Sequence, residues 1–210
     1  MSVFIVFEGG DAVGKSTQSG LLGQALAAAG VPHLITRQPG GTTLGAQLRH
    51  LILDPDGVVS ARAEALMYAA DKAQHVEEVV LPALGRGEVV VSDRYVDSMI
   101  AYQGAGRALD MAEVERLARW ATGSVVPDLT ILLDADPAQA VASIAKKDRL
   151  EGAGDEFHQR TRQFYLDLAE AHPERYLVLE ARGYRAAIAE RVWQRVRPLV
   201  QAHVGGSWQD

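Results

Sequence analysis

Residues 3–17 read VFIVFEGGDAVGKST. The first part, from Val3 to Phe7, is apolar throughout, which is typical of a strand buried on both faces of a sheet. The next part matches the pattern G-x-x-x-x-G-K-[ST], and a run compatible with a helix begins at Lys15. Such a loop turns its backbone N–H groups toward phosphate, and the helix N-terminus adds partial positive charge. The stretch therefore predicts a strand, a phosphate-binding loop and a helix.

Individual residues of this loop have expected roles. Gly9 and Gly14 permit backbone angles that a side chain disfavours. Lys15 is expected to contact the outer phosphates of a nucleotide, and the Ser16 hydroxyl to ligate Mg²⁺. An ordinary glycine-rich turn is the alternative, but it does not require the Lys-Ser pair. The residues expected to bind the nucleotide phosphates are Gly9, Gly10, Asp11, Ala12, Val13, Gly14, Lys15, Ser16 and Thr17.

Composition narrows the class of protein. A chain of 210 residues suits one domain, or one domain with a small lid, and an apolar content of 48% suffices for a sizeable core. The net charge of −6 argues against general nucleic-acid binding. The absence of cysteine excludes disulfides and thiolate metal sites, and the six histidines show no zinc-ligand spacing. No signal-like or membrane-spanning run is present, so we expect a cytoplasmic protein that binds neither membrane nor nucleic acid.

Short apolar runs alternate with helical runs along the chain. This alternation predicts an α/β fold in which a parallel sheet is covered by helices on both faces, giving three layers. The expected strands are 3–7, 33–36, 88–92, 129–133 and 175–179. The expected helices are 15–29, 43–53, 61–84, 96–103, 110–122, 138–146, 156–171 and 184–203.

Polar residues follow several of these strands. In parallel sheets ligands bind beyond the carboxyl ends of the strands, where Arg37, the Asp93-Arg94 pair and Asp134 fall together with the phosphate loop. Asp93 is placed to lie near Mg²⁺, and Arg94 is placed to hold an acceptor phosphate. The alternative is that the two residues form a structural ion pair. Asp134 suits either a second carboxylate near the metal or a cap for the helix that follows.

Two further groups of residues each have two interpretations. The cations Lys146, Lys147 and Arg149, with Arg160 and Arg162, form the densest positive region, which suits a flap over a triphosphate or a solvated helix end. Tyr68 and Lys72 are four residues apart and share one helix face. They could bind a base, or they could be a core tyrosine and a solvated lysine.

The chain resembles the thymidylate kinase family from Phe4 to about Ala181. The motifs that carry this resemblance are residues 8–17, TRQPGGT at 36–42, DKAQHVEE at 71–78, SDRY at 92–95 and AYQGAGR at 101–107. The resemblance implies a single P-loop kinase domain over residues 1–210 with a short lid at about 145–155. It also implies Mg²⁺ with ATP as phosphoryl donor, dTMP as acceptor, and a homodimer.

The resemblance also implies roles for particular residues. Lys15, Asp93, Arg94 and Arg149 would be catalytic, with Ser16 and Asp93 near the metal. Asp11 would meet the dTMP sugar, Arg49 and Arg94 its phosphate, and Tyr68 would stack on thymine. Lys146 to Arg149 would belong to the lid. The full set expected to bind the acceptor is Asp11, Arg37, Pro39, Arg49, Tyr68, Lys72, Arg94, Ser98, Tyr102, Gln103 and Tyr165.

Three positions depart from the family pattern on the side of the base. Gln38 stands where glutamate is common, Lys72 where an arginine usually contacts thymine, and Met99 where a small polar residue is usual.

The expected reaction is phosphoryl transfer from Mg·ATP to dTMP, giving dTDP and ADP for dTTP synthesis. The alternatives are another nucleoside monophosphate or deoxynucleoside kinase of this fold, or a regulatory P-loop NTPase. A GTPase would carry the guanine motif N-K-x-D, which the chain lacks.

Overall fold

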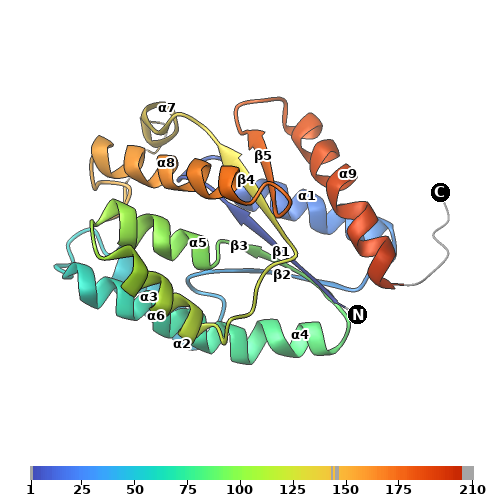
Figure 1. Cartoon of the computed structure of the whole chain (residues 1–210), viewed down its shortest axis with the longest axis horizontal. Helices are drawn as coiled ribbons and strands as arrows, with labels where there is room; N and C mark the ends of the chain where they lie inside the picture. Colours follow the sequence, from blue (N-terminus) through green and yellow to red (C-terminus); the bar gives the residue numbers. More distant parts are fainter. Residues whose placement is uncertain (1, 143, 145–146, 205–210) are drawn as a thin grey trace.

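The computed structural model describes residues 2–142, 144 and 147–204, and its centre is a parallel sheet (Figure 1). The strand order is β2-β3-β1-β4-β5, and every neighbouring pair is parallel. The α/β fold class predicted from the alternating pattern is therefore confirmed. The strands are β1 Val3–Glu8, β2 His33–Arg37, β3 Val89–Asp93, β4 Leu129–Asp134 and β5 Tyr176–Glu180.

The described helices agree with the expected ones in place, with two differences in kind and one in length. The helix expected at 138–146 is shorter, because α7 ends at Ala142 and Ile144 is not helical. The run expected at 61–84 is α3, a π-helical turn η1 and α4 in succession, and the run expected at 96–103 is α5 followed by the π-helical η2. The helices are α1 Lys15–Ala28, α2 Thr43–Leu53, α3 Ala61–His75, η1 Val76–Val80, α4 Leu81–Gly85, α5 Val96–Met99, η2 Ile100–Gly106, α6 Met111–Ala121, α7 Pro137–Ala142, α8 Asp155–Ala171 and α9 Arg185–Val204.

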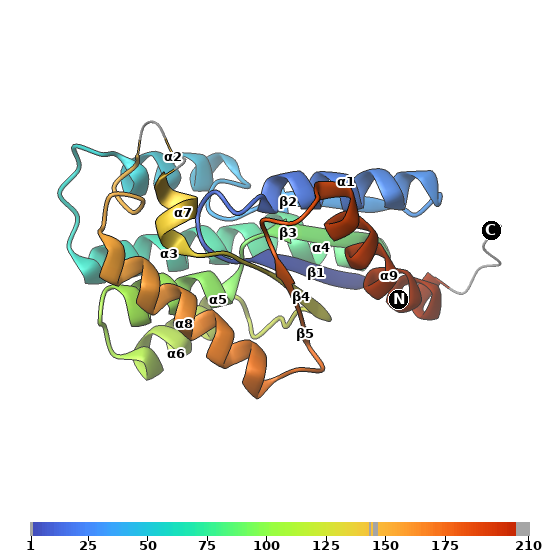
Figure 2. The same cartoon turned by 90° about the horizontal axis from the view of Figure 1, so that it is seen from above.

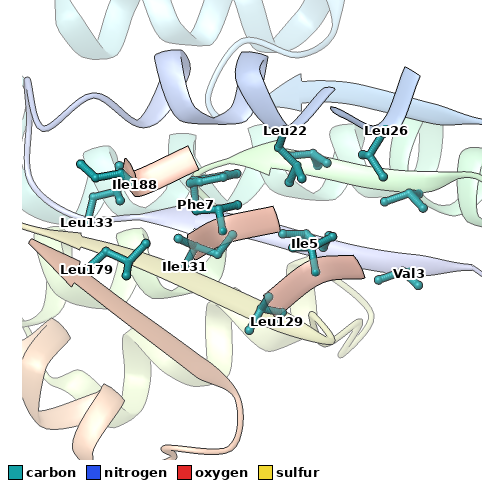
Figure 3. Close-up of a cluster of buried hydrophobic side chains, with 14 of the residues drawn as sticks. Val3, Ile5, Phe7, Leu22, Leu26, Leu129, Ile131, Leu133, Leu179 and Ile188 are labelled. Carbon is teal, nitrogen blue, oxygen red and sulfur yellow. The ribbon is translucent and has the colours of Figure 1, made fainter. Parts of the chain in front are cut away.

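Helices cover both faces of the sheet because β1 is apolar on both of its faces. Val3, Ile5 and Phe7 point toward α1 and α9 and belong to one buried cluster (Figure 3). Phe4 and Val6 point the other way and pack with residues of η1 and α4. In Figure 2, α1 lies on one side of the sheet and α8 on the other, which gives the three expected layers.

The central place of β1 positions the phosphate loop. Phe7 lies beside Asp93 of β3, and Glu8 lies beside Leu132 of β4. The loop after β1 therefore leaves the sheet between the ends of β3 and β4. This edge is the one at which ligands bind in such sheets.

Side-chain caps begin α2 and α7, and the second of them corrects an expectation. The Thr42 hydroxyl accepts a hydrogen bond of 2.9 Å from Gly45 N at the start of α2. At α7 it is Asp136, not Asp134, that accepts from a backbone N–H of the first turn, that of Ala138, at 3.0 Å. The prediction that Asp134 caps this helix is wrong, because its carboxylate is bound by Arg162. No helix within the described ranges combines the length and the apolar character that a membrane span needs.

Candidate functional site

The phosphate loop has the backbone shape that its glycines predict. Gly9 has a φ of +131°, and a Cβ there would lie 2.3 Å from the carbonyl oxygen of Leu133. Gly14 has a φ of +93° at the residue that precedes α1. Both positions require glycine, the first because of close approach to β4 and both because of positive φ.

Lys15 lies inside this loop with its side chain buried. Its Nζ donates to the carbonyl oxygens of Gly9 at 3.2 Å and Gly10 at 2.5 Å. Burial lowers the pKa of Lys15 to about 8, and the nearby charge of Arg94 acts in the same direction. The ammonium is thus held over the loop by two carbonyl oxygens, and an incoming phosphate would add a negative charge beside it.

Ser16 and Asp93, the two residues expected near the metal, lie in contact. The Ser16 hydroxyl donates to Asp93 Oδ2 at 2.6 Å. A hydroxyl and a carboxylate suit Mg²⁺, which takes few protein ligands and completes its coordination with water and substrate phosphates. The described residues hold no group of three or more His, Asp or Glu side chains arranged to bind a metal ion alone. The donor set therefore fits a metal that arrives with a nucleotide.

Arg94 connects the phosphate loop to the neighbouring pocket. Its Nη2 donates to Asp11 Oδ1 at 2.5 Å and to the Tyr102 hydroxyl at 3.1 Å, and its Nη1 donates to Gly9 O at 3.1 Å. The Tyr102 hydroxyl also donates to Asp11 Oδ2 at 2.8 Å. Burial alone would raise the pKa of Asp11, but the charges of Arg94 and Lys15 outweigh it and the pKa lies below its ordinary value. Asp11 is therefore ionised at neutral pH.

A pocket beside the loop gathers most of the residues expected to bind the acceptor. Arg37 is exposed at the end of β2, and Tyr165 is buried with its hydroxyl bonded to Glu8, so neither lines it. The expected residues that do line it are Asp11, Pro39, Arg49, Tyr68, Lys72, Arg94, Ser98, Tyr102 and Gln103.

Lys72 reaches the pocket from within a buried hydrogen-bond network. Its Nζ donates to Gln38 Oε1 at 2.8 Å and to Tyr95 O at 2.7 Å. The Gln38 amide lies 2.8 Å from His75 Nδ1, and His75 Nε2 lies 2.6 Å from the Thr36 hydroxyl. Burial lowers the pKa of Lys72 to about 8 and that of His75 to about 4, so the histidine is neutral at pH 7. The reading of Lys72 as a solvated lysine is wrong.

Met99, the third departure from the family pattern, has a different place. Its side chain is buried in the cluster that contains Tyr102 and Phe157, and it does not line the pocket.

The described part of the expected lid lies against the acceptor pocket. Arg149 donates to Ile52 O at 2.9 and 2.8 Å and pairs with the buried Glu64 at 2.6 Å. Of the other cations in the expected flap, Arg160 bonds the carbonyl oxygens of Ala105 and Gly106. Arg162 binds Asp134 through both carboxylate oxygens, at 2.8 Å each.

Lys147 is exposed, and Lys146 lies outside the described residues. The role of Lys146 in a lid therefore stays a prediction.

A model of the thymidylate kinase family matches residues 7–191 of the chain. The chain belongs to the thymidylate kinase family. It is 63% identical to the thymidylate kinase of Cutibacterium acnes over 94% of this chain and 98% of that protein. It is 52% identical to that of Clavibacter sepedonicus over 95% of this chain and 97% of that protein. The crystal structure of thymidylate kinase from Ehrlichia chaffeensis matches with a TM-score of 0.78 and 30% identity, over 93% of this chain and 98% of the other.

The structure adds residues to the acceptor pocket that the sequence did not assign to it. Gln38, Leu53, Asp148, Leu150 and Glu151 complete the lining of this pocket. The last four come from the end of α2 and from the segment before α8, where the sequence shows no pattern that points to a base or a sugar.

A second cavity, of about 300 Å³, lies on the other side of the phosphate loop. Its walls include Gly14, Gln18 and the segment that connects β5 to α9, with Arg182, Gly183 and Arg185. The rule that ligands bind beyond the strand ends could have found this segment, because it directly follows β5.

Proposed function

We propose that this thymidylate kinase family member transfers the γ-phosphoryl group of ATP to dTMP, giving dTDP and ADP. The observation that carries the proposal is the contact between Asp11 and Arg94. This contact joins a loop built for the phosphates of a donor to a pocket built for an acceptor. Phosphoryl transfer requires these two sites side by side, because its catalysis consists mainly of positioning and charge stabilisation.

The donor side would hold ATP through the phosphate loop. Lys15 would contact the outer phosphates, and the backbone N–H groups of residues 9–17 would bind the remaining phosphate oxygens. The cavity bounded by Gln18, Arg182 and Gly183 has the place expected for the base of the donor. Ser16 and Asp93 would hold Mg²⁺, which when bound neutralises the charge of the phosphates.

The acceptor side would hold dTMP by groups of matching chemistry. Arg94 and Arg49 carry guanidinium groups that suit its phosphate, and Asp11 with Tyr102 suits its sugar hydroxyl. The Tyr68 ring would stack on thymine. Lys72 is a donor only, so its ammonium suits a keto oxygen of thymine or uracil and disfavours the amino group of cytosine. Gln103, Ser98 and Pro39 would complete the walls.

Charge on the transferred group would be stabilised by cations from the loop, the acceptor side and the lid. Lys15 faces the phosphates from the loop, and Arg94 faces the attacking oxygen from the acceptor side. Arg149, with Lys147, would act from the lid, which would also exclude water from the reacting groups.

We also propose that the protein works in the cytoplasm, where ATP is abundant, and as a homodimer. Three helices that pack side by side, α2, α3 and α6, each leave a large apolar side chain exposed. Leu51 is 56% exposed on α2, Leu66 is 59% exposed on α3, and Trp120 is 81% exposed on α6. Exposed apolar groups on adjacent helices favour an interface with a second copy.

The test is ADP release from Mg·ATP with dTMP, dUMP, dCMP, dGMP, AMP and thymidine offered in parallel. Turnover with dTMP well above the rest supports the proposal. Equal turnover with dUMP would mean that the protein does not recognise the 5-methyl group of thymine. Acceptor-independent hydrolysis that no monophosphate stimulates would overturn the proposal in favour of a regulatory NTPase.

A further inference from the structure

Glu8, the last residue of β1, is a fully buried carboxylate that precedes the phosphate loop. Its Oε1 accepts hydrogen bonds from Tyr95 N at 2.8 Å and Ser98 N at 3.1 Å. Its Oε2 accepts from the Ser98 hydroxyl at 2.5 Å and from the Tyr165 hydroxyl at 2.9 Å. Four donors around one buried carboxylate satisfy it without an arginine or lysine in direct contact. All the donors come from segments that follow β3 or belong to α8.

The backbone that Glu8 holds has an unusual conformation. Arg94 has a φ of +70°, a left-handed value that is uncommon for any residue other than glycine. Residues in this region persist only when their surroundings hold them there. The side chain at 94 belongs to the acceptor site, so the strained residue is also a functional one.

All four polar backbone groups of Arg94 and Tyr95 have partners, which fixes the turn. Arg94 N donates to Phe7 O at 2.9 Å, and Arg94 O accepts from the Ser92 hydroxyl at 2.8 Å. Tyr95 O accepts from Lys72 Nζ at 2.7 Å. The remaining group, Tyr95 N, is the one that Glu8 holds.

The Arg94 side chain is tied to the same region through Ser98. Its Nη1 donates to the Ser98 hydroxyl at 3.1 Å, and that hydroxyl donates in turn to Glu8. Glu8 thus acts on Arg94 twice, through the backbone at Tyr95 and through the side chain at Ser98. Because Gly9 and Asp11 of the phosphate loop also bond Arg94, the guanidinium has a fixed place relative to the donor phosphates.

We propose that Glu8 is a positioning residue that holds Arg94 in register with the phosphate loop, so that the acceptor phosphate lies in line with the donor. The proposal rests on the proposed function, because it assumes that Arg94 binds the acceptor phosphate. It assigns Glu8 no contact with either substrate.

Glu8→Gln is the variant that tests this role with least damage to the fold. The amide has the same size and its oxygen still accepts from a backbone N–H. Its NH₂ group, however, meets the Ser98 and Tyr165 hydroxyls as a second donor, so both hydroxyls must turn around. The negative charge near Arg94 is lost as well.

Asp128→Asn is the matched control. The Asp128 carboxylate accepts from Phe4 N at 2.8 Å and so holds the other end of the same strand, away from the site. Each variant replaces a carboxylate with the corresponding amide. Each of these carboxylates accepts a hydrogen bond from a backbone N–H. Only the substitution at Glu8 should change dTMP binding at the acceptor site.

The experiment measures the Kd of dTMP and of Mg·ATP separately by titration calorimetry, together with the thermal midpoint. For Glu8→Gln we expect the Kd of dTMP to rise about tenfold and that of Mg·ATP to change less than about twofold. For Asp128→Asn both should stay within about twofold. If Glu8→Gln does not fold, Glu8→Asp takes its place, since it keeps the charge but draws the carboxylate back from Tyr95 N.

A double-mutant cycle with Arg94→Lys shows whether Glu8 acts through Arg94. In the Arg94→Lys background, Glu8→Gln should weaken dTMP binding by less than about twofold, because the positioned group is already gone. An undiminished effect there, an equal loss of Mg·ATP binding, or unchanged dTMP binding in Glu8→Gln would overturn the inference. Absence of dTMP binding by the unmodified protein would instead overturn the proposed function.

Discussion

At the scale of the residue, Lys15 is buried although it is charged, and removing it should affect turnover far more than stability. Lys15→Ala deletes the ammonium that faces the phosphates, so we expect kcat to fall by about 10²–10³. The thermal midpoint should change little, because burial of this charge gives the fold no net gain. Steady-state ADP release and a thermal melt measure the two effects. Near-full turnover in this variant would show that the loop is not the donor site.

Lys72 should make dTMP binding depend on pH. Its pKa is lowered from the ordinary 10.5 to about 8, so the ammonium that would donate to the base predominates below pH 8 and is lost above it. Between pH 7 and 9.5 the Kd of dTMP, measured without ATP, should therefore rise about tenfold.

Lys72→Arg is the control for this prediction, because arginine stays protonated over that range. Its Kd for dTMP should be flat with pH and lower than that of the unmodified protein. A parallel rise in both proteins would assign the titration to another group.

The sequence predicted local geometry best where the residues belong to one short stretch. Gly9, Lys15 and Ser16 belong to one short pattern, and the pattern carries its own structural context. Glu8 escaped such reasoning because its partner Tyr165 is 157 positions away. The sequence singled out Lys72, but its hydrogen bond to Gln38, 34 positions away, could not be predicted for the same reason. No periodicity links residues that meet only after the sheet has formed.

At the scale of the element, the strand–loop–helix unit depends on glycine at one position more than at others. Gly9→Ala would place a Cβ 2.3 Å from Leu133 O at a φ of +131°, so we expect a loss of about 3 kcal/mol in the free energy of unfolding. Gly20→Ala in α1, where a Cβ would meet nothing within 4 Å, should stabilise the protein by about 0.5–1 kcal/mol. Urea denaturation of both variants tests the pair. Equal stability of the two variants would contradict the observed loop geometry.

Apolar periodicity predicted the helix starts but not the π-helical turns. The starts at Lys15 and Thr43 agreed with the expectation because the residues before them are a glycine in a loop and a capping threonine. The π-helical turns at Val76–Val80 and Ile100–Gly106 were not expected, because an i→i+5 turn changes the apolar spacing by only one residue. The second of these turns carries Tyr102 and Gln103 to the acceptor pocket.

The segment before α8 yields a prediction that separates two roles for Arg149. Its guanidinium pairs with the buried Glu64 and bonds Ile52 O, which holds the segment with Asp148 and Leu150 at the acceptor pocket. If Arg149 mainly holds this segment against the acceptor pocket, Arg149→Met should raise the KM for dTMP about tenfold with little change in kcat. A fall in kcat at unchanged KM would assign Arg149 to the transferred phosphate instead.

Arg119→Met provides the matched control for Arg149. Arg119 pairs with Glu115 at 2.6 Å in an exposed i,i+4 arrangement on α6. Exposed pairs of this kind contribute little, so both kinetic constants should stay unchanged.

At the scale of the whole molecule, strand order explains why distant motifs form one site. The chain places β1 at the centre, with β3 and β4 on its two sides. The residues after β1 and β3 therefore meet, and the contact between Ser16 and Asp93 spans 77 positions of sequence. The alternating pattern predicted a parallel sheet, but it did not give the order of the strands.

Exposed apolar groups on α2, α3 and α6 lead to a prediction about assembly. If these helices pair across a two-fold axis, Leu66 of α3 lies in the interface, and Leu66→Glu would bury a charge against the second copy. We expect light scattering to give twice the chain mass of 22.6 kDa for the unmodified protein and the chain mass for Leu66→Glu. Tyr184→Glu, at a site that is 80% exposed between β5 and α9, should leave the mass doubled. A monomeric unmodified protein would refute the homodimer, and a Leu66→Glu protein that stays dimeric would place the interface on other helices.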